Sequence, residues 1–175
     1  MRARLFSLLL LSPSLAFAAW TQVGEGTATF DAKGPAGFKI HGDAKNVTVA
    51  DDGSALAVSV ALKDLDTDNG LRNKHLLEDT QAEQFPKMTL SAPLSAIKAP
   101  EDGKSVEAEA TGSPALHGQT KALPFKYTAS CKGAVCTIDA TANLNVNDFG
   151  IKIRSYLGVT VKPEVVIGAK FTLRR

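Results

Sequence analysis

The sequence has 175 residues, enough for one domain with a hydrophobic core. It carries 20 Lys and Arg against 18 Asp and Glu, so it lacks the large basic excess typical of nucleic-acid-binding proteins. No apolar run after the first residues reaches the length of a membrane span. These numbers favour one globular domain and exclude nucleic-acid binding and a transmembrane helix from our expectations.

The first segment, residues 1–18, differs from the rest of the chain. Two arginines near the start precede a short apolar run, Leu5–Leu11, and the final AFA fits the small-x-small rule for cleavage. We predict a signal peptide that is cut after Ala18, which leaves residues 19–175 as the domain; the alternative is an N-terminal anchor. Losing those two arginines reduces the 20 basic residues to 18, equal to the 18 acidic residues.

From Gly26 onward, apolar and polar side chains alternate with a period of two, the pattern of half-buried β-strands. Turn residues rich in Gly, Pro and Asp separate about eight such runs. No helices alternate with them, so we predict antiparallel strands in a sandwich or an up-and-down barrel. After the first run, the pattern continues through residues 38–41, 55–62, 87–92, 105–112, 123–128, 138–144 and 165–174.

Residues 68–85, DNGLRNKHLLEDTQAEQF, interrupt the strands with charged and amide side chains. Asp68 or Asn69 can cap a helix that starts near Gly70, and Pro86 ends the segment before the next strand. So short and polar a helix is not stable alone. We therefore expect a short helical insert over about residues 69–84 that docks at the open end of a barrel as a lid.

Cys131 and Cys136 are the only cysteines, and they flank the tight loop 132–135 between strand-like residues. Export leads to an oxidising compartment, and the two thiols lie at the mouth of a hairpin, where cross-strand Cβ atoms are within bonding reach. The spacing does not fit a CxxC redox pair, and two further ligands for a metal are missing. We predict a disulfide that contributes about 2 kcal/mol.

Three segments share features with one known family. The first is residues 62–90, with an acidic-Thr, Asn, Arg, His-Leu and aromatic-Pro pattern, and the second is residues 113–127, with an HG-x-T-K turn. The third is NDFGIKI, residues 147–153, followed by an apolar C-terminal strand from Val159 to Leu173. With these features the sequence resembles the YceI-like family, the lipid- or polyisoprenoid-binding, lipocalin-like proteins of the bacterial periplasm. The pattern residues here are Asp66, Thr67, Asn69, Arg72, His75, Leu76, Phe85, Pro86, Leu116, His117, Gly118, Thr120 and Lys121.

The resemblance covers nearly all of residues 19–175 and implies an all-β fold: an eight-stranded antiparallel lipocalin-like β-barrel with a short helical insert. It also implies a long isoprenoid, a polyprenyl lipid or quinone, held in an elongated apolar lumen. This sequence departs from the family at Asn73, where the family usually has Asp. Burying each five-carbon isoprene unit contributes roughly 3–4 kcal/mol before ordering losses, so binding needs no catalytic group and no cofactor.

The inward faces of the strands supply the expected ligand wall. They mix large side chains with many Ala and Gly residues, a pattern compatible with either a hollow lumen or a tapered, packed core. The predicted ligand-binding residues are Phe30, Phe38, Ile40, Val58, Val60, Met88, Leu90, Phe125, Tyr127, Ile138, Leu144, Ile167 and Phe171.

Polar residues near the expected rim have two interpretations. Three of them are candidates for contact with a ligand head group: Arg72, His75 and His117. The alternative is structural, with Arg72 paired to Asp66 or Asp68 and the histidines bonded to nearby backbone. The three histidines of the chain lack metal-binding spacing, and no serine lies in a nucleophile elbow, so we expect neither a metal site nor catalytic residues.

The predicted function is sequestration of a long apolar isoprenoid for transport or storage in the periplasm, without catalysis. Two alternatives are a packed module that binds a periplasmic partner protein and a haem- or redox-associated accessory protein. Monomer and dimer are both open at this stage.

Overall fold

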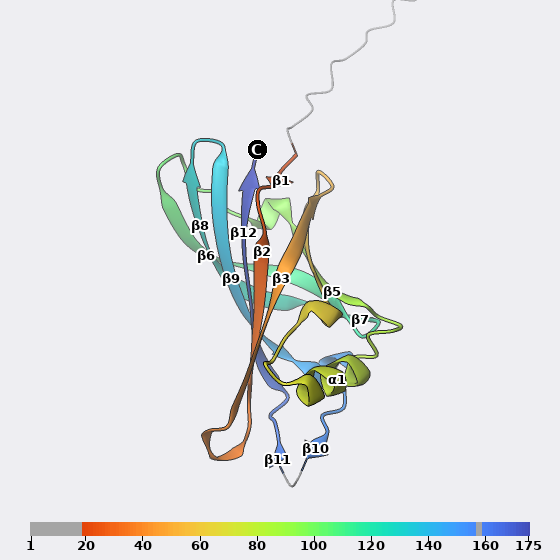
Figure 1. Cartoon of the computed structure of the whole chain (residues 1–175). Helices are drawn as coiled ribbons and strands as arrows, with labels where there is room; N and C mark the ends of the chain where they lie inside the picture. Colours follow the sequence, from red (N-terminus) through yellow and green to blue (C-terminus); the bar gives the residue numbers. More distant parts are fainter. Residues whose placement is uncertain (1–18, 157–158) are drawn as a thin grey trace, which may run out of the picture.

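The computed structural model describes residues 19–156 and 159–175, so the predicted signal peptide, residues 1–18, lies outside the described residues. The main sheet has ten strands, of which β1 and β7 are two-residue additions. The other eight close into an antiparallel β-barrel, which confirms the predicted fold class (Figure 1). These strands are β2 (Gly26–Lys33), β3 (Lys39–Asp51), β4 (Ala55–Ala61), β5 (Lys87–Pro93), β6 (Ser105–Leu116), β8 (Leu123–Lys132), β9 (Val135–Asn145) and β12 (Glu164–Arg174).

The barrel closes through its last strand. Neighbouring strands follow chain order from β2 to β9, and β12 lies between β9 and β2. β12 pairs with β9 over Glu164–Arg174 and with β2 over Val165–Lys170, antiparallel in both cases. The additions β1 (Thr21–Gln22) and β7 (Gln119–Thr120) pair with β12 and β6. Closure pairs both edges of the sheet and separates an inner from an outer face.

Burial alternates along the strands as the sequence predicts. In β8, Leu123, Phe125 and Tyr127 are buried, whereas Pro124 and Lys126 are exposed. The same alternation continues to the end of the strand. Apolar side chains therefore gather inside the barrel, where their removal from water stabilises the fold.

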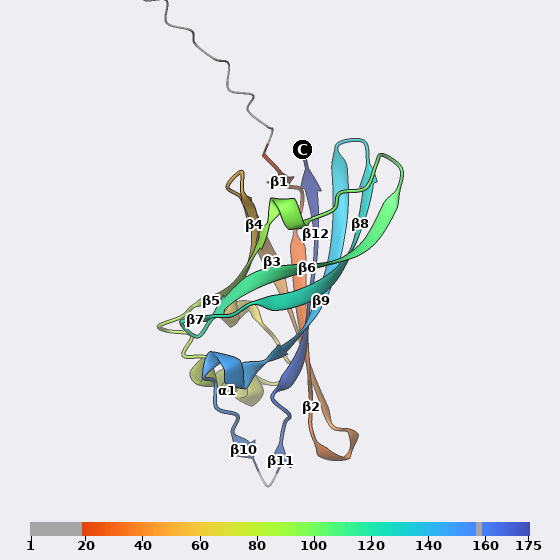
Figure 2. The ribbon, with the colours of Figure 1, turned by 180° about the vertical axis from the view of Figure 1, so that it is seen from behind.

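The two ends of the barrel differ in construction (Figures 1 and 2). We call one the disulfide end; it holds the β8–β9 turn, the 3-10 helix η3 (Leu94–Ala96) and the C-terminus. We call the other the helix end; it holds α1 (Gly70–Asp79), the small hairpin of β10 (Ser155–Tyr156) and β11 (Val159–Thr160), and the tip of the β2–β3 hairpin. Two views related by 180° show that hairpin projecting beyond the barrel.

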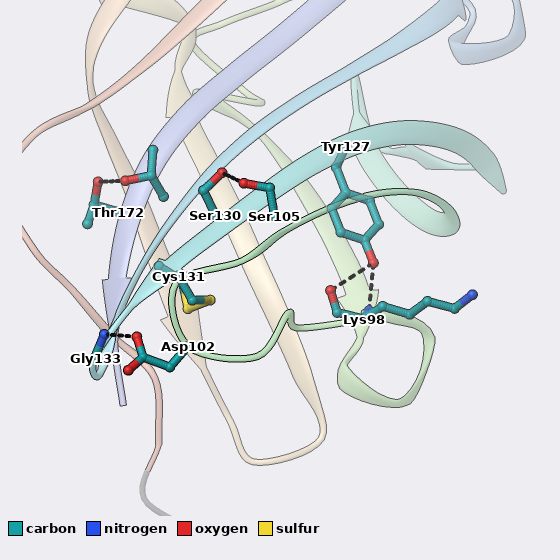
Figure 3. Close-up of a disulfide and its surroundings, with 10 residues drawn as sticks. Lys98, Asp102, Ser105, Tyr127, Ser130, Cys131, Gly133 and Thr172 are labelled. Carbon is teal, nitrogen blue, oxygen red and sulfur yellow. Dashed lines mark hydrogen bonds between the residues drawn. A yellow bond between two sulfur atoms is a disulfide. The ribbon is translucent and has the colours of Figure 1, made fainter.

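At the disulfide end, Cys131 and Cys136 are directly paired across β8 and β9 and form the predicted disulfide (Figure 3). The Lys98 N–H donates to the Tyr127 hydroxyl oxygen at 2.6 Å, which fixes the loop before β6 to the barrel interior. The Gly133 N–H donates to Asp102 Oδ1 at 2.6 Å and links the β8–β9 turn to the same loop. These contacts tie this end together.

The predicted helical insert is present and begins as expected. Asn69 caps α1, because its side-chain oxygen accepts hydrogen bonds from the N–H groups of Leu71 and Arg72, each at 3.1 Å. The helix ends at Asp79, and turns continue to Phe85 instead of a longer helix. Within the described residues, no helix is long and apolar enough to cross a membrane.

Asn73 anchors the insert to the barrel through both halves of its amide. Its NH₂ donates to Asp66 Oδ1 at 2.8 Å, and its oxygen accepts from the Thr67 hydroxyl at 2.7 Å and the Thr67 N–H at 2.9 Å. Asp66 in turn exchanges backbone hydrogen bonds with Asp43 on β3. The hydrogen bonds from Asn73 and from the Asp68 N–H lower the pKa of Asp66 below its ordinary value.

Candidate ligand-binding cavity

A cavity of about 280 Å³ runs from the barrel interior toward the helix end. Its walls come from all eight strands of the barrel and from the segments that cover the helix end. The lining is predominantly apolar; its few polar residues include Thr29, Ser59 and Thr141 on strands and Asp79 and Lys162 at the helix end. A cavity with so apolar a lining suits a hydrocarbon ligand.

Small residues in one row create this space. Ala169 on β12 pairs with Ala28 on β2 and with Ala140 on β9, so three alanines lie side by side across three neighbouring strands. All three line the cavity. One level further along the strands, Ile167 pairs with Phe30 and Ala142, so two of the three residues at that level are larger. The row of alanines therefore leaves a hollow that larger side chains at the same positions would fill.

Most of the predicted wall residues lie around this cavity. The eight that line it are Phe30, Val58, Val60, Met88, Leu90, Phe125, Leu144 and Ile167. Their contact with a ligand stays a prediction, but the structure brings them together from β2, β4, β5, β8, β9 and β12.

Five predicted wall residues lie elsewhere. Tyr127 and Phe171 are buried in the packed interior, and Ile138 packs against the same clusters toward the disulfide end. Phe38 and Ile40 lie toward the tip of the β2–β3 hairpin, and Phe38 is 45% exposed. Tyr127, Phe171 and Ile138 do point into the barrel, as predicted, but they lie further along the barrel axis than the cavity.

Several lining residues come from segments outside the regular strands. They include Leu62, Leu65, Leu76, Val146, Ile153 and Val161. Leu76 belongs to α1, and in the sequence it was marked only as part of the family pattern. Leu62 ends the alternating run 55–62, which marks it as inward, although it begins a 3-10 helix. The remaining four lie in 3-10 helices and connecting segments, where no regular period marks an inward position.

A polar bridge crosses the helix end beside the cavity. The Arg154 guanidinium donates from Nη1 to Glu78 Oε2 at 2.8 Å and from Nε to Asp79 Oδ1, which joins the segment before β10 to the end of α1. The hydrogen bonds to Glu78 and then to Asp79 raise the pKa of Arg154. Ile153 precedes Arg154 and Thr80 follows Asp79, and both of these neighbours line the cavity. We call this bridge the Arg154 latch.

The three predicted rim residues do not belong to the lining. His117 donates from Nδ1 to the Phe149 carbonyl at 2.8 Å, and its ring packs edge-on against Phe85. Its Nε2 is buried and has no hydrogen-bond partner among the described residues. His75 is half-buried on α1. Arg72 forms no ion pair with Asp66 or Asp68 in the described part of the chain, so a head-group role for these three stays a prediction.

Possible metal ligands are dispersed. Across residues 19–156 and 159–175, no group of three His, Cys, Asp or Glu side chains is close enough to hold a metal ion. His41, the remaining histidine, lies on the outer face and bonds Asp31 Oδ1 through Nδ1 at 2.9 Å.

Comparison with known proteins identifies the family. Residues 17–173 match the YceI-like domain. The protein belongs to the YceI-like family. This match confirms the resemblance seen in the sequence.

Two solved structures share the YceI-like fold of this protein. A polyisoprenoid binding domain from Saccharophagus degradans, implicated in plant cell wall breakdown, superposes with a TM-score of 0.70 at 10% identity, covering 85% of this chain and 93% of that one. BcnA of Burkholderia cenocepacia superposes with a TM-score of 0.66 at 16% identity, covering 84% and 95%. No curated protein sequence matches the chain significantly. At these identities the likeness establishes the fold.

Proposed function

We propose that this YceI-like protein binds one long isoprenoid, a polyprenyl lipid or quinone, in its cavity and carries or stores it in the periplasm. The observation that carries the proposal is the apolar cavity beside the paired alanines Ala28, Ala169 and Ala140. The polyisoprenoid-binding description of the Saccharophagus degradans domain supports the ligand class.

The size and chemistry of the cavity fit part of a prenyl chain. Its volume of about 280 Å³ lies just below the roughly 300–1,000 Å³ range of small-molecule sites. Each five-carbon unit that enters contributes roughly 3–4 kcal/mol, so a few units offset the cost of ordering the ligand. The polar end of such a lipid would face the helix end, where Asp79, Thr80 and Lys162 lie.

Two features support export to the periplasm. The N-terminal residues have the pattern of a signal peptide, and the Cys131–Cys136 disulfide is of a kind that persists in oxidising compartments. Water-insoluble lipids that cross this compartment need a shielded path. A barrel with a dry interior provides one without catalysis.

The proposal is tested by extracting the purified protein with organic solvent and identifying the extract by mass spectrometry. We expect a prenyl lipid from the wild-type protein and at least tenfold less from Ala140→Phe, because the ring fills the hollow and one isoprene unit alone contributes roughly 3–4 kcal/mol. Ala50→Phe, on the exposed face of β3, is the matched control and should retain the lipid. Extracts without any prenyl lipid in several preparations would refute the proposal.

A further inference from the structure

The tip of the β2–β3 hairpin is an ordered loop that projects from the helix end (Figures 1 and 2). The Gly34 N–H donates to the Phe38 carbonyl at 2.7 Å, and the Phe38 N–H donates to the Pro35 carbonyl at 3.0 Å. The Phe38 ring lies over Gly34, where a Cβ would come within 2.9 Å of it. The loop therefore holds the aromatic ring against Gly34 while Phe38 stays 45% exposed.

The chemistry of this tip is apolar at the end and basic at its base. Residues 34–38, GPAGF, carry no charge, and Phe38 is 45% exposed. Lys33 and Lys39 are paired across the two strands directly behind them, and both are exposed. The Lys162 N–H donates to the Lys33 carbonyl at 2.6 Å, which brings a third exposed lysine to the same place. We call Phe38 and these lysines the hairpin tip.

We propose that the hairpin tip docks the protein on the surface of a lipid bilayer that contains anionic lipids. An exposed aromatic ring gains free energy by entering the headgroup boundary, and lysines behind it keep their ammonium groups at the level of the phosphates. Lysines near an anionic surface add an electrostatic attraction, which decays with distance over about one Debye length. The nearest acid on β2, Asp31, is bonded to His41 on the outer face, on the barrel side of the lysines.

The position of the hairpin tip relates docking to the cavity. Lys162 belongs both to the tip and to the cavity lining, so the end that meets the bilayer is also the end where the cavity approaches the surface. If docking serves lipid transfer at this end, that part of the inference rests on the proposed function. Docking itself rests on the tip residues alone, so an empty cavity would leave it intact.

Vesicle flotation tests the inference on the purified protein, with its N-terminal residue established by intact mass. The vesicles contain phosphatidylcholine alone or phosphatidylcholine and phosphatidylglycerol in equal parts. We expect binding to the anionic vesicles, weakened by added salt, and weakened about fivefold for each lysine lost in Lys33→Glu/Lys39→Glu. Phe38→Ala should weaken it roughly fivefold through lost apolar contact.

The control pair is Lys98→Glu/Lys132→Glu, which makes the same change in net charge at the disulfide end, where Lys132 ends β8 and both lysines are exposed. It should bind anionic vesicles like the wild-type protein. Equal losses in the two pairs would show attraction by net charge alone, and wild-type protein that does not float with anionic vesicles would overturn the inference. Lipid extracted from the same variants separates this outcome from failure of the cavity.

Discussion

The two ends of the barrel come from the same alternating pattern, yet one is packed and the other is hollow. At the disulfide end, Leu56, Phe171 and Leu173 form a buried cluster against Trp20. Toward the helix end, Ala28, Ala169 and Ala140 leave a cavity. Alternation decides which face is inward, whereas the size of the residues paired at one level decides whether that level is filled.

The pairing along β9 and β12 shows the difference within a few residues. Phe171 pairs with Ile138, a large residue opposite a large residue, at the packed level. Two positions further along, Ala169 pairs with Ala140 at the hollow level. A binding site thus needs only a change of residue size along a continuous strand pair, because neighbouring side chains in a packed interior do not expand to fill the gap.

The largest expected contrast compares Phe171 with Phe30. Phe171→Ala removes a ring from the packed cluster and should lower the free energy of unfolding by about 3–5 kcal/mol. Phe30→Ala removes a ring that already borders the cavity, so it should lower the free energy of unfolding by about 1–2 kcal/mol less than Phe171→Ala, or by less still. Urea unfolding of ligand-free protein measures both. Equal losses would contradict the division into a packed and a hollow end.

Removing the disulfide sharpens the comparison at the packed end. Cys131→Ser/Cys136→Ser should lower the free energy of unfolding by about 2 kcal/mol, because the bond closes only a short loop in the unfolded chain. The lipid recovered per mole of folded protein should not change, since neither cysteine lines the cavity. A fall in bound lipid with folding intact would show that the two ends are coupled.

Asn73→Asp tests how the insert is held at the hollow end. The substitution replaces the amide that donates to Asp66 with a carboxylate that repels it, and we expect the melting temperature to fall by about 2–4 °C. Asn143→Asp, on the exposed face of β9, should change it little.

The loss of stability in Asn73→Asp should also depend on pH. The pKa of Asp66 is lowered in the folded protein, so its contribution to stability is present above the ordinary pKa of aspartate and is lost as pH falls through the folded value. The wild-type protein should therefore lose its advantage over Asn73→Asp in acid. Melting curves at several pH values measure this, and an advantage that persists below the folded pKa would contradict the assignment.

The Arg154 latch should have the smallest effect on stability and a clearer effect on exchange. Arg154→Ala should leave the melting temperature within about 1–2 °C, because exposed ion pairs contribute little, and should speed transfer of bound lipid to acceptor vesicles several-fold. Lys74→Ala is the matched control, because Lys74 pairs with the same Glu78 at 3.9 Å but stays within α1. Unchanged transfer in Arg154→Ala would show that the latch does not limit lipid exit.

Sequence patterns predicted the parts of this structure that follow a regular period or local chemistry. The alternating runs predicted antiparallel strands in a sandwich or a barrel, and the family resemblance selected the barrel. Asn69 was one of two expected caps of the insert, and the spacing of Cys131 and Cys136 predicted the disulfide. Tyr127 was placed on the correct face, but its level in the barrel depends on pairing between strands that are distant in sequence.

The rest of the cavity had no such signal. Leu76, Ile153 and Val161 reach the lining from a polar helix and from connecting segments, whose positions are decided by tertiary contacts. Phe38 has the alternation of an inward residue, yet it lies in the loop just before β3, at the tip of a hairpin that extends beyond the barrel, and it is exposed. Phe38 is therefore outside the cavity wall because the hairpin is long, and not because of its residue type.

The most direct test of the central claim, a hollow that holds one apolar chain, is native mass spectrometry of the protein purified from its own cells. The account predicts a folded species heavier than the polypeptide by one prenyl lipid, an adduct that disappears on denaturation and is largely absent from Ala140→Phe. A folded species with the mass of the polypeptide alone, reproduced across independent preparations, would contradict it.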